Sequence, residues 1–300
     1  MLLWVIYMLL SSWLENWLSL RAGSLAPRTL ECYRSTIRLH IVPVLGAVDL
    51  PDLKPEQLAE LLGMISAGGH TRTAQLTHAI LHKAFADAVR HRLLSSSPMA
   101  DVPRPAHRAQ RAQWLDPSIL AAYLAAVDRD PHRLAWLLAL YCGLRRGEIA
   151  GLRWCDVDMR AQVLHICNQR QRLESGEIVD LPPKSFAGNR PIPIPPQLLD
   201  ELRAARRIGG YVVQYCGHPI TPAALDRAHA RMLARAGLPH CRLHDIRHTM
   251  GAVAVRSGVP IKVLQVLLGH AHYSTTADIY AHVDAAAARD AIARIAAAMI

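Results

Sequence analysis

The segment LLGHAHYSTTADIYAHV, residues 267–283, contains three histidines and two tyrosines near the end of a 300-residue chain. Residues of these types can bind a metal ion, pack in a core, or act as nucleophiles through a tyrosine hydroxyl. Gly269 follows an apolar helical pattern and is expected to end that helix, which places His270 at the helix end. A second helix is expected after Tyr273 and should carry Tyr280. Neither tyrosine alone separates catalysis from packing.

The motif LHDIRHTMG offers a metal site as one alternative. His244 lies three residues before Arg247 and four before His248, so the three share a helical face. Two histidines at this spacing can bind zinc if the segment 267–283 supplies a third ligand. However, the zinc-protease pattern needs glutamate directly after the first histidine, where this chain has Asp245. The cationic Arg247 would also repel a divalent ion. We therefore expect no metal here.

Two further cations stand in suggestive places. In LYCGLRRGEIAG, one helix is expected to end at Gly143 and another to begin near Arg146. Arg145 is then held between two short backbone segments, which suits a guanidinium that clamps an oxyanion. The alternative is a surface arginine paired with Glu148. Lys184 is expected where a β-hairpin turns, and a lysine in such a place is ordinarily solvated.

The order of these motifs along the chain resembles that of the tyrosine recombinases, most closely the phage and integrative-element integrases. The order is an arginine in CGLRRGE, a lysine in KSFAGNRPIPI, the motif HDIRH, and LGH followed ten residues later by tyrosine. The first part of the chain also resembles that family's core-binding domain, in PRTLECYRSTIRLHIVPVLGAVDLPDL and LHKAFADAVRHRLLSSSPMADV. The resemblance covers almost the whole chain.

The resemblance implies a set of catalytic residues with Glu148 in support: Arg145, Lys184, His244, Arg247, His270 and Tyr280. A phosphodiester is a poor electrophile because its anionic oxygens repel the nucleophile, so cutting it without metal needs fixed cations and proton donors. The two arginines fit the non-bridging oxygens, and the two histidines add hydrogen bonds.

Tyr280 is implied as the nucleophile that forms a 3′-phosphotyrosine. The free phenol has a pKa of about 10, so attack at neutral pH needs the cationic pocket or a base such as His244. Lys184 is implied as the acid that protonates the departing 5′-hydroxyl. The phosphotyrosine conserves the bond energy, so no metal, ATP or cofactor is expected.

The implied partner is double-stranded DNA carrying a core-type site. The resemblance implies four protomers on two duplexes with a Holliday-junction intermediate, and a weak oligomer or monomer in free solution. The tail DAAAARDAIARIAAAMI is expected to dock on a neighbouring protomer, with packing inside its own protomer as the alternative. Accessory DNA-bending or excision factors fit the same reading. Recognition of distant arm sites is not expected, because no arm-type domain precedes the first core-binding helix.

Composition agrees with an anionic partner. The formal net charge is +10 and the pI is near 9.7, with 34 basic residues against 24 acidic ones. Six cysteines without a CxxC pair indicate a reducing interior, so we expect a cytoplasmic, nucleoid-associated protein encoded by a bacterium or phage. The apolar start is interpreted as an amphipathic helix over 2–20, with a signal anchor as the alternative.

The predicted fold is mainly α with a small antiparallel β-sheet. An all-helical core-binding domain of the SAM-like type is expected over 1–94, a basic linker over 95–113, and a catalytic domain over 114–300 with a docking helix from about 284. The helix that starts at Pro27 is expected to stop before Pro43 and Gly46. The sheet is expected between AQVLHICNQ and NRPIPIPP. Two domains joined by a basic linker suggest a C-shaped clamp around the duplex.

Three other functions compete with a site-specific recombinase or integrase that integrates or excises a mobile element. A type IB topoisomerase-like enzyme would use similar residues to relax supercoils as a monomer. A DNA-binding protein without catalysis would not need all six implied catalytic residues. A zinc hydrolase would lose its activity to chelators. The sequence specifies neither the target site nor the direction of the reaction.

Overall fold

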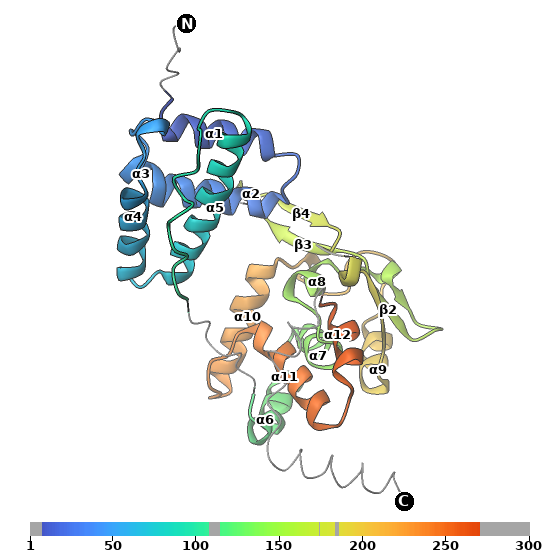
Figure 1. Ribbon diagram of the computed structural model, residues 1–300. Helices are drawn as coiled ribbons and strands as arrows, with labels where there is room; N and C mark the ends of the chain where they lie inside the picture. Colours follow the sequence, from blue (N-terminus) through green and yellow to red (C-terminus); the bar gives the residue numbers. More distant parts are fainter. Residues whose placement is uncertain (1–7, 108–114, 174, 184–185, 271–300) are drawn as a thin grey trace, which may run out of the picture. The chain divides into compact units, whose positions relative to one another are not determined.

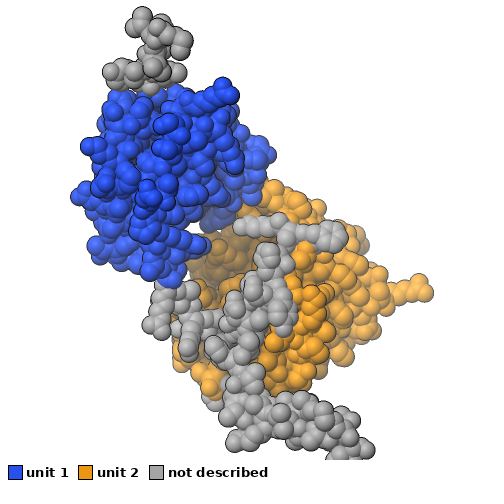
Figure 2. Space-filling view, in the orientation of Figure 1, with its two compact units in different colours: residues 1–110 blue, residues 111–300 orange. Residues whose placement is uncertain are grey.

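The chain forms two compact units, residues 1–110 and 111–300, shown in blue and orange in Figure 2. The computed structural model describes residues 8–107, 115–173, 175–183 and 186–270. Each unit has its own hydrophobic core. Helices dominate both, and short antiparallel strands occur in the second (Figure 1). The predicted fold class, mainly α with a small antiparallel sheet, is confirmed.

The first unit is built from amphipathic helices. In α1, Leu10, Trp13, Leu14 and Trp17 recur at helical spacing and are all buried. Trp17 donates its indole N–H to Asp87 at 2.8 Å, which ties α1 to the longest helix of the unit. The described elements of this unit are α1 (Leu10–Arg21), α2 (Pro27–Thr36), a π turn (Ile37–Ile41), α3 (Val42–Leu45), a 3₁₀ turn (Leu50–Asp52), α4 (Pro55–Ala67) and α5 (Thr71–Arg90).

The structure adds detail to two predictions for this unit. The helix from Pro27 does not stop before Pro43 but continues through a π turn into α3, and Gly46 ends it. Pro43 has no N–H to donate to the preceding turn, and the wider π turn fits that interruption. The stretch predicted as a linker from residue 95 begins inside the first unit, because Met99 and Val102 are buried in its core.

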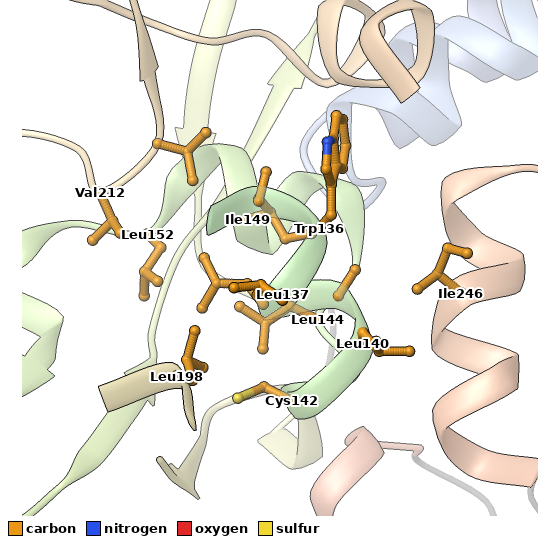
Figure 3. Packing of buried hydrophobic residues seen from close by; sticks show 14 of the residues in the cluster. Trp136, Leu137, Leu140, Cys142, Leu144, Ile149, Leu152, Leu198, Val212 and Ile246 are labelled. Atoms are coloured by element: carbon orange, nitrogen blue, oxygen red, sulfur yellow. The ribbon is translucent and has the colours of Figure 1, made fainter. Parts of the chain in front are cut away.

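The second unit is organised around α7 (Arg133–Cys142). Every residue of α7 from Ala135 to Leu140 is buried, as expected of a central helix. Figure 3 shows Ile246 and Leu198 directed at α7 from two neighbouring helices. The other described helices are α6 (Pro117–Asp128), α8 (Arg146–Gly151), α9 (Pro196–Ala205), α10 (Pro222–Arg235), α11 (Leu243–Arg256) and α12 (Ile261–Leu268). α11 packs on α7, and α12 packs on α11 and the strand β5.

The strands form small antiparallel sheets beside these helices. A three-stranded sheet has the order β1-β2-β5, and Ile166 of β2 is paired with Arg190 of β5. The described strands are β1 (Val157–Asp158), β2 (Val163–Ile166), β3 (Gln169–Arg172), β4 (Ile178–Leu181), β5 (Arg190–Pro193), β6 (Gln214–Tyr215) and β7 (His218–Pro219), with 3₁₀ turns at Trp154–Asp156 and Phe186–Gly188.

The β3–β4 hairpin is an element that the sequence did not predict. It lies between β2 and β5, and its turn falls between Arg172 and Ile178. In the chain, Lys184 follows β4 and precedes β5, so it belongs to the connection between the paired strands β2 and β5, and its place in a hairpin turn stays a prediction. Residues 184–185 themselves lie outside the described part of the chain.

A buried cation holds this hairpin against the rest of the unit. Arg170 of β3 stacks 3.9 Å from the ring centroid of Tyr211 and donates to Asp180 of β4 at 2.9 Å. Arg153 and the Tyr211 hydroxyl donate to the same carboxylate. Burial alone would raise the pKa of Asp180, but these donors lower it. The carboxylate therefore stays charged and keeps the hairpin fixed.

A second polar pair in the core joins α6 to α10. The Tyr123 hydroxyl lies 3.1 Å from Nε2 of His229, whose side chain is buried. Burial raises the pKa of Tyr123 and lowers the pKa of His229 to about 4. The tyrosine is therefore protonated and the histidine neutral at pH 7, so the hydrogen bond joins two uncharged groups in the core.

This pair predicts that acid destabilises the second unit. The unfolded chain binds a proton at His229 near pH 6.5, whereas the folded chain resists it until about pH 4. Stability is complete above the first pKa and falls through the second, by about 3 kcal/mol in total at about 1.4 kcal/mol per pKa unit. Melting temperatures from pH 7 to 4 should fall less steeply for His229→Gln than for the natural chain. The exposed control His240→Gln should keep the natural slope; an equal slope in both variants would contradict the assignment.

No helix in the described part of the chain is long and apolar enough to cross a membrane. All six cysteines have free thiols. Cys142, the last residue of α7, is fully buried, and burial raises the pKa of its thiol to about 12. Its role is packing.

Candidate active site

The junction of α7 and α8 positions the first candidate arginine. Gly143 adopts a left-handed conformation with φ of 60°, which ends α7 as predicted. A side chain here would be strained and would also collide, since an added Cβ would lie 2.7 Å from Leu268. α8 begins at Arg146, so Arg145 is its N-cap residue. The two helix ends hold the backbone of Arg145 on both sides.

Glu148 fixes the side chain of Arg145. Its carboxylate accepts the backbone N–H of Arg145 at 2.9 Å and the guanidinium at 2.7 Å. The Glu148 side chain is only 3 % exposed, whereas that of Arg145 is 35 % exposed. The anchor is thus buried, and the cation it holds is open to solvent. The two residues therefore do not form the simple surface ion pair considered as the alternative, because only Arg145 lies at the surface.

α11 supplies the second arginine and a histidine. Asp245 accepts the backbone N–H of Arg242 at 2.8 Å and caps the start of this helix. Arg247 is completely buried; it donates to the Gly143 carbonyl at 2.5 Å and to the Leu268 carbonyl. His244 lies one turn earlier on the same helix. The predicted shared face of His244 and Arg247 is confirmed.

α12 ends at the third part of the site. Gly269 has a φ of 62° and terminates the helix, so His270 lies at the helix end as predicted. Gln265 donates to the backbone carbonyl of His270 at 3.1 Å, which holds the turn. The guanidinium of Arg145 donates to the Gly269 carbonyl at 3.0 Å. Residues 124 positions apart in the chain therefore meet here.

One buried arginine in this site was missed by sequence reasoning. Arg190, the first residue of β5, donates to the carboxylate of Glu148 through two nitrogens, at 3.2 and 3.1 Å. It also donates to the carbonyls of Leu267 at 2.7 Å and Gly188 at 3.0 Å. The only signal in the sequence is an arginine inside the apolar stretch NRPIPI.

Three arginines thus bind three successive carbonyls at the end of α12. Arg190 takes the carbonyl of residue 267, Arg247 that of 268, and Arg145 that of 269. The last carbonyls of a helix have no intrahelical partners and carry the negative end of the helix dipole, so cations are favoured there. The helix end therefore gathers and orients positive charge.

The surrounding charges set the protonation states. Burial would raise the pKa of Glu148, but the cations of Arg190, Arg145 and Arg247 lower it, so the carboxylate is ionised. His244 reaches the surface, yet partial burial, its neighbour His248 and the arginines lower its pKa to about 4.

Burial and the cations of Arg247 and Arg145 lower the pKa of His270 to about 3. Both candidate histidines are neutral at pH 7, and each then offers one N–H donor. An anion bound beside them would favour the charged form and raise both pKa values.

The other predicted site residues lie outside the described part of the chain. These are Lys184, Tyr273 and Tyr280, together with the lesser candidates His272 and His282. Within the described residues, no three metal-ligating side chains come together. His248 packs edge-on against His244 with ring centroids 4.8 Å apart. What the described residues do bring together is Arg145, His244, Arg247 and His270.

This arrangement suits an oxyanion rather than a metal. Rigid guanidinium groups with neutral imidazole donors match the non-bridging oxygens of a phosphate. Cations that are already fixed need little reorganisation when negative charge develops on a reacting group.

Comparison with known proteins agrees with this chemistry. The chain is 33% identical to the tyrosine recombinase XerC-like protein of Caldanaerobacter subterraneus over 180 residues, which is 51% of this chain and 46% of that protein. It is 29% identical over 270 residues to the putative prophage phiRv2 integrase of Mycobacterium tuberculosis, covering 85% of this chain and 70% of the relative. The chain therefore spans less than half of the first relative and a little over two thirds of the second.

Solved structures share the fold at low sequence identity. A Tn1549 transposon integrase in complex with circular intermediate DNA superposes with a TM-score of 0.83 at 20% identity, covering 96% of this chain and 99% of that one. A lambda integrase tetramer bound to a Holliday junction gives a TM-score of 0.71 at 20% identity, covering 92% of this chain and 78% of that one.

Models of protein families match both units. The model for the N-terminal SAM-like domain of phage integrases matches residues 9–62. The model of the phage integrase family matches residues 113–287, more than half of the chain and the part that contains the candidate site. The chain belongs to the phage integrase family of tyrosine recombinases.

Proposed function

We propose that this protein is a site-specific DNA recombinase that cuts and rejoins DNA through a 3′-phosphotyrosine and thereby integrates or excises a mobile element. One observation carries the proposal: Arg145, Arg247 and His270 meet at the end of α12, with His244 on the face of α11 beside them. This constellation supplies the positive charge and donors that a phosphodiester needs. The relatives that carry the names integrase and tyrosine recombinase support it.

In this proposal each described residue of the site has a role. Arg145, held by Glu148 and partly open to solvent, contacts a non-bridging oxygen of the scissile phosphate. Arg247, buried beneath the same helix end, adds a second fixed cation. His244 and His270 are neutral before DNA binds, and each donates one hydrogen bond to the phosphate oxygens. Their pKa values rise once the anion is in place.

Tyr280 and Lys184, which lie outside the described part of the chain, complete the proposed reaction. The Tyr280 hydroxyl gives its proton to a base such as His244, its oxygen bonds to phosphorus, and the bond between phosphorus and the 5′ oxygen breaks. Lys184 gives its proton to the departing 5′ oxygen. A 5′-hydroxyl of the exchanged strand reverses these steps, so the two new phosphodiesters form without an external energy source. Glu148 supports Arg145 and takes no proton, because its pKa is lowered.

The proposed partners follow from the reaction. Four protomers on two duplexes exchange one pair of strands, pass through a Holliday junction, and exchange the second pair. A solved relative is a lambda integrase tetramer on such a junction, which supports this arrangement. We place the protein in the cytoplasm, on DNA, with residues 1–94 as the core-binding domain. DNA-bending or excision factors and the docking of the tail from about residue 284 belong to the same proposal.

A covalent-trapping experiment tests the proposal. The full chain is incubated in EDTA with a nicked duplex that carries a core site from the DNA flanking its gene. Loss of the short fragment beyond the nick prevents religation and traps the protein on the 3′ end. A covalent adduct is expected, with a joint molecule when a second duplex is added. Relaxation of supercoiled DNA without any joint molecule would favour a topoisomerase instead, and absence of an adduct would exclude both enzymes.

The general acid is tested with a better leaving group. Lys184→Ala should bind the nicked duplex normally but cleave it roughly 10²- to 10⁴-fold more slowly, as expected when a positioned proton donor is lost. A sulfur atom in place of the bridging 5′ oxygen leaves without protonation, so this substrate should restore cleavage. Lys262→Ala is the matched control, because Lys262 is exposed on α12, and it should behave like the natural protein. Failure of the thio substrate to rescue Lys184→Ala would exclude the acid role.

A further inference from the structure

Arg190 is a buried arginine to which sequence and family assignment gave no function. Its side chain is 3 % exposed, as is that of Glu148, its ion-pair partner. It makes hydrogen bonds to the Glu148 carboxylate, the carbonyl of Leu267 and the carbonyl of Gly188. A guanidinium with this many fixed acceptors is a rigid junction between elements. The elements it joins are α8, the end of α12 and the segment that enters β5.

Arg190 shares both anchors of Arg145. The two guanidiniums donate to the same oxygen of Glu148, at 2.7 Å from Arg145 and 3.2 Å from Arg190. They also bind the same helix end, at the carbonyls of residues 269 and 267. The packing around this junction is tight, because a Cβ on Gly269 would lie 2.8 Å from Arg190. A change at Arg190 must therefore move or loosen the groups that aim Arg145.

The charge of the junction leads to the same conclusion. Glu148 carries one negative charge, and the guanidiniums of Arg145 and Arg190 both pair with it. Without Arg190, Glu148 would lose one of the cations beside it, and Arg145, which donates to the same carboxylate, would have to balance more of its charge. Arg145 would then interact more strongly with Glu148 and less with a bound phosphate, because a buried ion pair becomes stronger when a second cation no longer shares the carboxylate.

We propose that Arg190 is a positioning residue that holds Glu148 and the end of α12. It thereby keeps Arg145 directed at the scissile phosphate and leaves the charge of Arg145 free to interact with that phosphate. This inference rests on the proposed recombinase function and adds a residue to its machinery. All three nitrogens of the Arg190 guanidinium are bonded to protein acceptors, so its effect reaches the phosphate through Arg145.

The test compares two forms of the scissile phosphate. Single-turnover cleavage of the nicked duplex is measured with the natural phosphate and with a methylphosphonate, in which a methyl group replaces one charged oxygen. Arg190→Gln should cleave the natural phosphate about 10- to 100-fold more slowly, the range found when the outer partner of a site's ligand is removed. It should lose much less on the neutral methylphosphonate, which does not need the charge of Arg145. The dissociation constant for DNA should change little.

Arg170→Gln is the matched control. Arg170 is also a buried arginine of the same unit that is ion-paired with a carboxylate, but its partners are Asp180 and Tyr211. A loss of packing or stability alone should slow both substrates equally, as we expect for this control. Arg190→Lys keeps the charge beside Glu148 without the forked geometry, so it should recover part of the natural-phosphate rate and provides the test if Arg190→Gln does not fold.

The outcomes separate this inference from the proposed function. Equal slowing of both substrates in Arg190→Gln or Arg190→Lys, or no slowing of either, overturns the positioning role while the adduct of the natural protein still supports a recombinase. Failure of the natural protein to form any adduct overturns the recombinase and the positioning role together. Selective loss on the natural phosphate supports both.

Discussion

Replacing Tyr280 with phenylalanine should abolish the covalent protein–DNA adduct. The phenol oxygen is the atom that bonds to phosphorus, and phenylalanine keeps the ring while removing that atom. A loss on the order of 10⁶-fold in the cleavage rate is expected, the scale seen when the nucleophile of a covalent enzyme is removed. The nicked duplex and a denaturing gel measure it directly. DNA binding should be unchanged, because the arginines that bind the phosphate remain.

Tyr273→Phe is the matched control for this prediction. Tyr273 is seven residues from Tyr280 in the same segment of the sequence, and like Tyr280 it lies outside the described part of the chain. The same chemical change at Tyr273 should leave the adduct intact. An adduct that persists in Tyr280→Phe and disappears in Tyr273→Phe would move the nucleophile to Tyr273 and reject the alignment of the motif.

The described part of the site was predictable because its signals are local. Gly143 and Gly269 end helices by adopting left-handed backbone conformations, and this habit of glycine is visible in a sequence. The spacing of His244 and Arg247 fixes a shared helical face without any knowledge of the fold. These short-range rules place each residue at the end or on the face of a helix. Their order along the chain then supplied the family resemblance.

Arg190 could not be predicted by the same rules. Its partners lie 42 residues away at Glu148 and 77 residues away at Leu267. A burial of this kind depends on how β5 packs against α12 and α8, and no spacing in the sequence reports it. In a chain with 34 basic residues, one more arginine carries no signal. Only the three-dimensional structure shows that it shares a carboxylate with Arg145.

The missed β3–β4 hairpin has a related cause. Its first strand, QRQR, contains no apolar residue, so it lacks the alternation by which a half-buried strand is recognised. Arg170 takes the buried position of that strand because it stacks on Tyr211 and pairs with Asp180. A cation whose partners come from elsewhere in the fold behaves as a core residue. Hydrophobic periodicity cannot find such a strand.

Arg247→Lys should slow cleavage of the nicked duplex by about 10²- to 10³-fold, the loss typical of removing one preorganised donor from an anion site. Lysine keeps the positive charge but has a single nitrogen on a flexible stem. Arg247 uses separate nitrogens for the Gly143 and Leu268 carbonyls, and so ties the end of α7 to the end of α12. One ammonium group cannot span both carbonyls and also face the phosphate.

Arg242→Lys provides the comparison for this prediction. Arg242 lies at the start of the same helix and pairs with Asp245, but its side chain is 67 % exposed. The Arg242 guanidinium binds Asp245 from the surface and takes no part in the proposed phosphate site, so lysine should replace this arginine with a cleavage rate close to that of the natural protein. The two variants carry the same chemical change, one helical turn and a half apart.

The measured pair of rates decides what Arg247 contributes. If its charge alone mattered, Arg247→Lys would cleave about as fast as Arg242→Lys, and the role of the guanidinium fork would be rejected. If the fork mattered only for folding, the loss in rate would disappear at a temperature where the variant is fully folded, as judged by its melting curve. A rate that stays low in a folded protein with normal DNA affinity is the expected result. It would show that the bonds to Gly143 and Leu268 act in catalysis, because they hold Arg247 and the turn before His270 in one geometry around the phosphate.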